Sequence, residues 1–145
     1  MPAFSGTFSG NVSMQSAVNP VDQPNHQIHL AEVRGIQKSP DEKWNNSAIT
    51  YWGVTDLIED QGVQRGYFHN LHTNGDADFG TFEGKVAAKA GELLVEGTWK
   101  TTNGTGQLKG MTGSGTFKTR STLSGTVEAS WQGNYELAGA KAAGR

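Results

Sequence analysis

The stretch GTGQLKGMTGSGTF, residues Gly104–Phe117, combines five glycines with a terminal aromatic residue. A dinucleotide-binding loop requires G-x-G-x-x-G before a helix, but Gly104 and Gly106 are followed by Lys109 at the third glycine position. A P-loop requires Gly-Lys-Ser/Thr at its end, whereas Gly110 is followed by a methionine. We therefore interpret the stretch as two strands joined by a tight turn.

A short motif, Gly-Thr followed by an aromatic residue or valine, recurs at irregular intervals. In a strand, alternate residues share a face, so the glycine and the aromatic residue point one way and the threonine the other. The aromatic side chain can then cover the bare backbone beside a glycine. A solenoid would show a fixed period, so the motif indicates similar geometry on several strands. The copies lie at Ser5–Gly10, Gly80–Gly84, Glu96–Lys100, Ser114–Lys118 and Ser124–Glu128.

Turn-rich segments divide the chain into about eight runs with strand character, and no run shows the apolar spacing of a helix. The pair Asn74–Gly75 favours a type I′ hairpin turn, in which both central residues have positive φ. We predict an all-β fold, one closed antiparallel barrel of eight strands over residues 1–137, with a frayed tail at 138–145. The expected strands are Ala3–Met14, His26–Ile36, Ala48–Glu59, Val63–His72, Asp78–Ala87, Leu93–Thr101, Gly113–Arg120 and Leu123–Glu136.

Composition excludes several kinds of site. The 145 residues include no cysteine, which rules out disulfides, thiolate zinc sites and cysteine nucleophiles. The net charge is -2 and no Lys/Arg run occurs, so we expect no nucleic-acid partner. We find no secretory signal pattern and no apolar run of about 20 residues. We therefore expect a cytoplasmic protein with no membrane partner and no cofactor.

Gly104–Phe117 resembles the glycine signature of the allene oxide cyclase-like barrels, and more narrowly that of small bacterial relatives with an uncharacterised domain. The resemblance covers about the last third of the chain. It implies an eight-stranded, calycin-like barrel and a homo-oligomer, either a dimer or a trimer. It transfers no catalytic residue. The matching positions are Gly104, Gly106, Leu108, Gly110, Gly113, Gly115 and Phe117.

An eight-stranded barrel is just wide enough to hold side chains or one small ligand, so inward-facing polar residues are the candidates for a site. Arg65, Tyr67 and His69 alternate along one expected strand and therefore share a face. We expect this face to line the cavity, with His69 as general acid/base and Tyr67 and Tyr51 as hydrogen-bond donors. Arg65 or Arg34 would hold an anionic group.

The opposite face of this strand is the alternative. If a bulge at Gly66 shifts the register, or if the face assignment is inverted, Phe68, Asn70 and His72 replace the first three residues.

Further candidates come from neighbouring strands. Glu32 and Arg34 share a face, which lies either in the pocket or outside the barrel. His29 and His69 could form a metal site completed by Glu32 or Asp78, or be ordinary histidines; we assign no metal. The expected catalytic residues are His69, Tyr67, Tyr51 and Glu32. The expected substrate-binding residues are Arg65, Arg34, His29, Asp78, Phe82 and Trp99.

These residues favour an enzyme that works without a cofactor. We expect a lyase, isomerase or cyclase that acts on a small hydrophobic or aromatic metabolite by acid–base chemistry. A non-catalytic carrier of small ligands and a structural oligomeric barrel are the alternatives. A buried histidine beside Tyr and Arg would favour catalysis, and an apolar cavity without them would favour a carrier.

Overall fold

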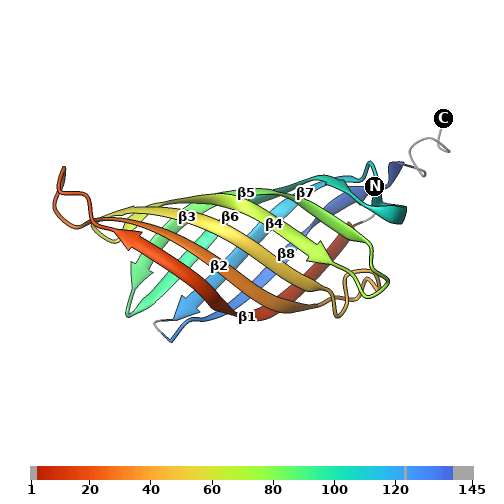
Figure 1. Ribbon diagram of the computed structural model, residues 1–145, viewed down its shortest axis with the longest axis horizontal. Helices are drawn as coiled ribbons and strands as arrows, with labels where there is room; N and C mark the ends of the chain where they lie inside the picture. The colour runs from red at the N-terminus through yellow and green to blue at the C-terminus, as the bar shows by residue number, and fades with distance from the viewer. Residues whose placement is uncertain (1–2, 123, 139–145) are drawn as a thin grey trace.

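The computed structural model describes residues 3–122 and 124–138 and forms a single closed antiparallel barrel (Figure 1). Each strand pairs with the next along the chain, and β1 pairs with β8 to close the barrel. The all-β, eight-stranded prediction is confirmed. The strands are β1 (Ala3–Val18), β2 (His26–Lys38), β3 (Ala48–Ile58), β4 (Gln61–Leu71), β5 (Ala77–Lys89), β6 (Glu92–Gly104), β7 (Thr112–Thr122) and β8 (Thr126–Glu136).

The Gly104–Phe117 stretch has the strand, turn and strand arrangement that the sequence predicts. Strand β6 ends at Gly104, a 3-10 turn, η1 (Gly106–Leu108), follows, and β7 begins at Thr112. Gly106 and Gly110 have φ values of 59° and 80°, a region in which side chains are disfavoured. The buried Leu108 and Met111 in this connection close one end of the barrel.

Glycines face each other across four pairs of strands. At Gly115 an added Cβ would lie 1.9 Å from the Gln132 carbonyl oxygen, so a larger residue cannot fit without backbone movement. The indole of Trp99 lies over both Gly115 and Gly133. At this pair an aromatic ring therefore fills the interior space that the glycines leave. The pairs are Gly10–Gly35, Gly53–Gly66, Gly84–Gly97 and Gly115–Gly133.

Asn74–Gly75 lies in the β4–β5 hairpin, but the type I′ prediction is wrong. Gly75 has a φ of 92°, whereas Asn74 is not at positive φ. The Asn74 side-chain oxygen instead accepts a hydrogen bond from the Asp76 N–H (2.9 Å), which stabilises a longer turn. Two-residue turns with positive φ at both positions lie at Glu59–Asp60 (51° and 68°), between β3 and β4, and at Ala90–Gly91 (53° and 79°), between β5 and β6.

The tail predicted for residues 138–145 lies, beyond Ala138, outside the described residues. Within the described ranges, no helix has the length and apolar character needed to cross a membrane.

Candidate binding cavity

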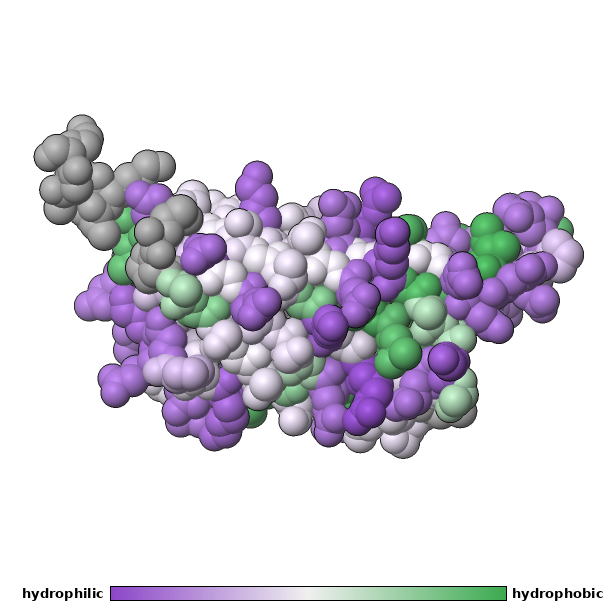
Figure 2. Space-filling model, turned by 180° about the vertical axis from the view of Figure 1, so that it is seen from behind, coloured by the Kyte–Doolittle hydropathy of each residue, from purple (hydrophilic) through white to green (hydrophobic). Residues whose placement is uncertain are grey.

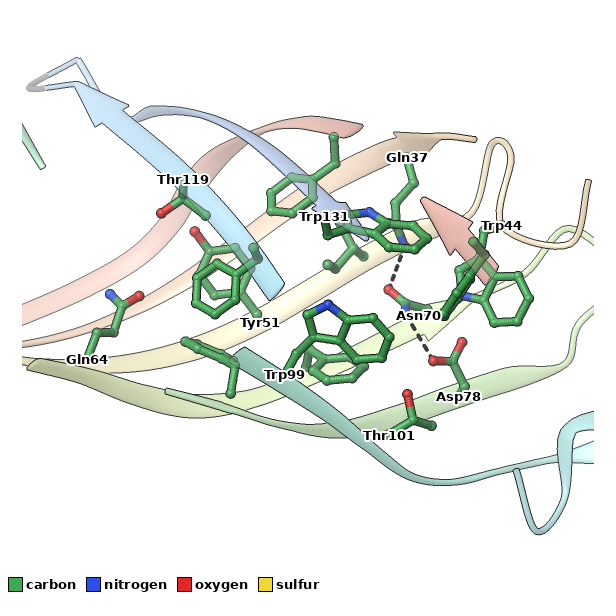
Figure 3. A pocket seen from close by; sticks show the side chains of 16 residues that line it. Gln37, Trp44, Tyr51, Gln64, Asn70, Asp78, Trp99, Thr101, Thr119 and Trp131 are labelled. Atoms are coloured by element: carbon green, nitrogen blue, oxygen red, sulfur yellow. Dashed lines mark hydrogen bonds between the residues drawn. The ribbon is translucent and has the colours of Figure 1, made fainter. Parts of the chain in front are cut away.

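The barrel interior contains a small, partly open cavity with aromatic walls (Figure 3). Its volume is about 80 Å³. A buried water needs about 10–15 Å³, and an apolar cavity of about 150 Å³ holds benzene, so a ligand with a single small ring enters this space only as the side chains of the wall adjust. The aromatic wall consists of Phe4, Phe8, Trp44, Tyr51, Phe68, Phe82, Trp99, Phe117 and Trp131.

One end of the cavity is polar. Gln37, Asn70, Asp78 and Thr101 come from four strands and lie together at this end (Figure 3). The Gln37 amide donates to Asn70 Oδ1 (2.7 Å), and the Asn70 amide donates to Asp78 Oδ2 (3.1 Å). Gln37, Asp78 and Thr101 are 1–2% exposed and Asn70 is 6% exposed. Hydrogen bonding satisfies groups that would be costly to bury unpaired.

His72 extends this chain of hydrogen bonds away from the cavity. Its Nε2 lies 2.6 Å from Asp78 Oδ1, and its Nδ1 lies 2.6 Å from the Lys43 carbonyl oxygen. A carbonyl oxygen only accepts, so Nδ1 carries a proton. The hydrogen bond between His72 Nε2 and Asp78 Oδ1 then needs a second proton, which is carried either by Nε2 or by the carboxyl group. In either case the pair of side chains is neutral overall.

His72 separates the cavity from a surface depression. The ring packs edge-on against Trp44, with ring centroids 5.0 Å apart, and is only 5% exposed. It lines the depression formed by the loops, and it does not line the cavity. Asp78 therefore faces the cavity, and His72 lies behind it on the side of the surface loops.

Two hydroxyl groups of the cavity wall remain available to a ligand. Tyr51 and Thr101 line the cavity and each carries a hydroxyl group. Among the described residues, the buried polar atom without a hydrogen-bond partner is the indole Nε1 of Trp131, which also lines the cavity. Burial raises the pKa of Tyr51, because the phenolate would lose its hydration. Tyr51 therefore remains a neutral donor over the physiological pH range.

The prediction that Arg65, Tyr67 and His69 face the cavity is wrong. Tyr67 is 65% exposed, and Arg65 is also exposed on the outer wall. His69 pairs with Thr50 on the same outer face, whereas Tyr51 pairs with Phe68 on the inner one. The inverted assignment holds for β4: Phe68 and Asn70 point inward from the strand, and His72 is buried directly after it.

Glu32 and Arg34 lie on the outer wall. Arg34 is 70% exposed, and its Nε donates to Glu32 (3.2 Å). Glu32 also accepts from the Ser13 hydroxyl and from the Trp52 indole, both at 2.8 Å. The Ser13 and Trp52 hydrogen bonds, aided by Arg34, lower the pKa of Glu32. An outer-wall position separates both residues from the cavity.

His29 is also remote from the cavity. Its Nε2 lies 3.1 Å from the Gln27 side-chain oxygen, on the part of β2 that pairs with the end of β3. His29 does not lie with His69, and the described residues contain no group of three His, Asp or Glu side chains placed to hold a metal. The alternative metal site is therefore not formed by these residues.

Four expected site residues line the cavity: Tyr51, Asp78, Phe82 and Trp99. Sequence reasoning did not single out Gln37 or Trp44. Gln37 could have been found from its position on β2, because it follows Val33 and Gly35 at alternate positions on the inward face. Trp44 lies in the Ser39–Ser47 loop, where no strand periodicity indicates a direction.

In comparisons with known proteins, no protein-family model, curated protein or solved structure matches the chain.

Proposed function

We propose that the barrel binds a small, neutral, largely apolar molecule, with its ring or alkyl part among the aromatic side chains and one oxygen at the polar end. The observation that carries this proposal is the composition of the cavity wall. Aromatic rings make up most of it, and a hydrogen-bonded polar group lies at one end beside Asp78, with Gln64 and Thr119 at the opposite end (Figure 3). Ligand sites commonly combine apolar walls with a few fixed polar groups.

Charge favours a neutral ligand. Arg, Lys and His are absent from the described residues that line the cavity, and Asp78 is the carboxyl group among them. A carboxylate ligand would have no cation to pair with and would lose its hydration on entry. The Tyr51 and Thr101 hydroxyls can instead bond to an alcohol, phenol or carbonyl oxygen. A neutral ligand agrees with the expected small hydrophobic or aromatic molecule, but it does not need the anionic group that Arg65 or Arg34 was expected to hold, and an apolar wall without Arg favours the carrier alternative.

We further propose that the chain is related to the allene oxide cyclase-like barrels. The support is the glycine signature of Gly104–Phe117 together with the closed eight-stranded antiparallel topology. This relationship implies a fold and no particular ligand.

The test is thermal unfolding in the presence of phenol or benzene. Phenol should raise the melting temperature of the wild type with a Kd on the order of 1 mM, and benzene should bind more weakly because it lacks the hydroxyl. Thr119→Leu fills the cavity and should abolish the phenol effect. Thr116→Leu is the control, since Thr116 is exposed on the same strand. An equal phenol effect in both variants would overturn the proposal.

A second candidate function is the cofactor-independent lyase or isomerase expected from the sequence. The observation in its favour is the carboxyl group of Asp78, which faces the cavity and is held by Asn70 and His72. An ionised Asp78 could take a proton from a carbon next to a ligand carbonyl, while the Thr101 hydroxyl donates a hydrogen bond to the enolate oxygen. Return of a proton to the same carbon completes a hydrogen exchange, and delivery to the γ-carbon of an unsaturated ketone completes an isomerisation.

Deuterium uptake separates this function from simple binding. Cyclopentanone in D₂O should gain deuterium at its α-carbons faster with the wild type than with buffer. Asp78→Asn keeps the shape and hydrogen-bonding capacity but lacks the base, so it should lose exchange while still binding phenol. If wild type and Asp78→Asn exchange at the same rate, Asp78 is not a base in this protein.

A further inference from the structure

The barrel has one strand segment whose outer edge is unpaired. Strand β1 pairs with β8 from Ala3 to Asn11, and it pairs with β2 from Thr7 to Val18. The Val12 N–H donates to the carbonyl of Gly125 (2.8 Å), the residue just before β8 begins. Beyond this bond, the segment from Ser13 to Val18 has no described partner on the β8 side.

This segment forms part of a hairpin that projects from the barrel, at the left of Figure 1. All six of its side chains are exposed, and Met14 and Val18 are 67% and 58% exposed. Figure 2 shows hydrophobic side chains gathered toward this end of the molecule. In an antiparallel strand, every second residue directs its N–H and C=O away from the paired neighbour. The segment therefore presents free backbone donors and acceptors.

The projecting edge lacks the usual protection against strand pairing. Natural edges carry Lys, Pro or an inward-pointing charge, or they bend at a bulge. A bulge lies between Val12 and Met14, but Met14 to Val18 continue in regular register with β2. The sequence of this segment, MQSAV, has no charged residue and no proline.

We propose that the edge Met14–Val18 pairs with the same edge of a second copy, in antiparallel orientation about a two-fold axis. Such an interface is self-complementary, because each copy offers the same row of donors and acceptors. In this arrangement every side chain meets one from the same short segment. A charge in the segment would therefore face its own copy, and the uncharged composition avoids that repulsion.

The size of the edge sets the strength of the dimer. Five paired residues per copy bury less than the roughly 1,200–2,000 Å² of a stable interface. The dimer therefore forms at high protein concentration and dissociates on dilution. This inference is independent of the ligand proposal, because the edge lies outside the cavity.

Analytical ultracentrifugation over about 10 μM to about 1 mM tests the proposal. The wild type should show a monomer–dimer equilibrium. Ser16→Lys and Ser16→Glu should each raise the dissociation constant by about fivefold or more, because like charges meet across the two-fold axis. An equimolar mixture of the two variants should restore the dimer. Ser9→Lys is the control, since Ser9 is exposed on β1 but paired on both edges.

Two results would overturn the proposal. One is a wild type that stays monomeric throughout this range, which would leave the edge to a different partner or to none. The other is a dimer that Ser16→Lys does not weaken, which would place the contact elsewhere, for example on the outer wall at Trp52 and Tyr67. Circular dichroism of each variant confirms that the barrel is folded.

Discussion

The two ends of the barrel interior are closed in different ways. At one end, loops of five to nine residues cover buried rings and a polar chain that runs from Gln37 through Asp78 to His72. At the other end, two-residue turns join β3 to β4 and β5 to β6, and Leu57, Val86 and Val95 form an aliphatic plug. The polar chain that faces the cavity therefore lies under the long connections, whereas the two-residue turns lie beside the aliphatic plug.

The largest expected effect compares one residue from each end. Asp78→Ala removes the acceptor of both His72 and Asn70 and should lower the free energy of unfolding by about 3–5 kcal/mol. Val95→Ala in the aliphatic plug should lower it by about 2 kcal/mol, through lost contacts and a small cavity. Urea denaturation measures both. If Val95→Ala lowers the free energy of unfolding more than Asp78→Ala does, the polar chain does not stabilise the end of the barrel that the long loops cover.

A second comparison tests the two faces of β4. Phe68→Ala should lower the free energy of unfolding by about 3 kcal/mol, because Phe68 is buried among aromatic rings. Tyr67→Ala should change it by less than about 0.5 kcal/mol, because Tyr67 lies exposed on the outer wall. A larger loss of stability for Tyr67→Ala than for Phe68→Ala would support the sequence-based prediction that Tyr67 faces the cavity.

The error on β4 shows what the sequence could have decided. The prediction that Tyr51 faces inward is confirmed, and residues paired across a hairpin share a face. An even number of residues in the β3–β4 turn pairs Tyr51 with an even-numbered position, which puts Phe68 inward and Tyr67 outward. The exposed apolar residues Val63 and Leu71 concealed this result, because they made the outer face resemble a core face.

Other features of the structure could be predicted from the sequence to different degrees. The strands follow from alternation and turn residues, and their predicted limits differ from the observed ones by at most four residues. The polar end depends on contacts between residues far apart in the chain, such as Gln37 with Asn70, which no local pattern encodes. Trp44 joins the cavity wall because of the path of its loop.

A third prediction concerns two glycines on β7, between the two ends of the barrel. Gly115→Val should lower the free energy of unfolding by about 2–3 kcal/mol, because the new Cβ would lie 1.9 Å from the Gln132 carbonyl oxygen and 2.6 Å from the Trp99 ring. Gly113→Val should lower the free energy of unfolding by less, because a Cβ added at Gly113 would lie 2.9 Å from its nearest neighbour, the Asn134 carbonyl oxygen. Equal urea midpoints for the two variants would contradict this packing.

The smallest effect is a pH dependence at the end with the aliphatic plug. His26 lies 2.7 Å from both Asp22 and Asp56. Hydrogen bonds to Asp22 and then Asp56 raise the pKa of His26 above 6.5, and the same contact lowers the pKa of Asp22. The stabilisation is therefore present in full below about pH 6.5 and disappears as the pH rises through the raised pKa. On the acid side it is lost only when Asp22 is protonated.

His26→Gln should thus be less stable than the wild type near about pH 5–6 and nearly equal to it near about pH 9. Urea midpoints across this range measure the difference. A difference that grows with pH would contradict the assigned contacts.

The central claim, that the interior takes up a small neutral ligand, is tested most directly by a ¹H–¹⁵N spectrum of the four tryptophan indoles during a phenol titration. Trp44, Trp99 and Trp131 line the cavity, whereas Trp52 lies on the outer wall. The account predicts that the Trp99 and Trp131 signals shift with one shared Kd while the Trp52 signal stays in place. A shift confined to Trp52, or no shift at saturating phenol, would contradict it.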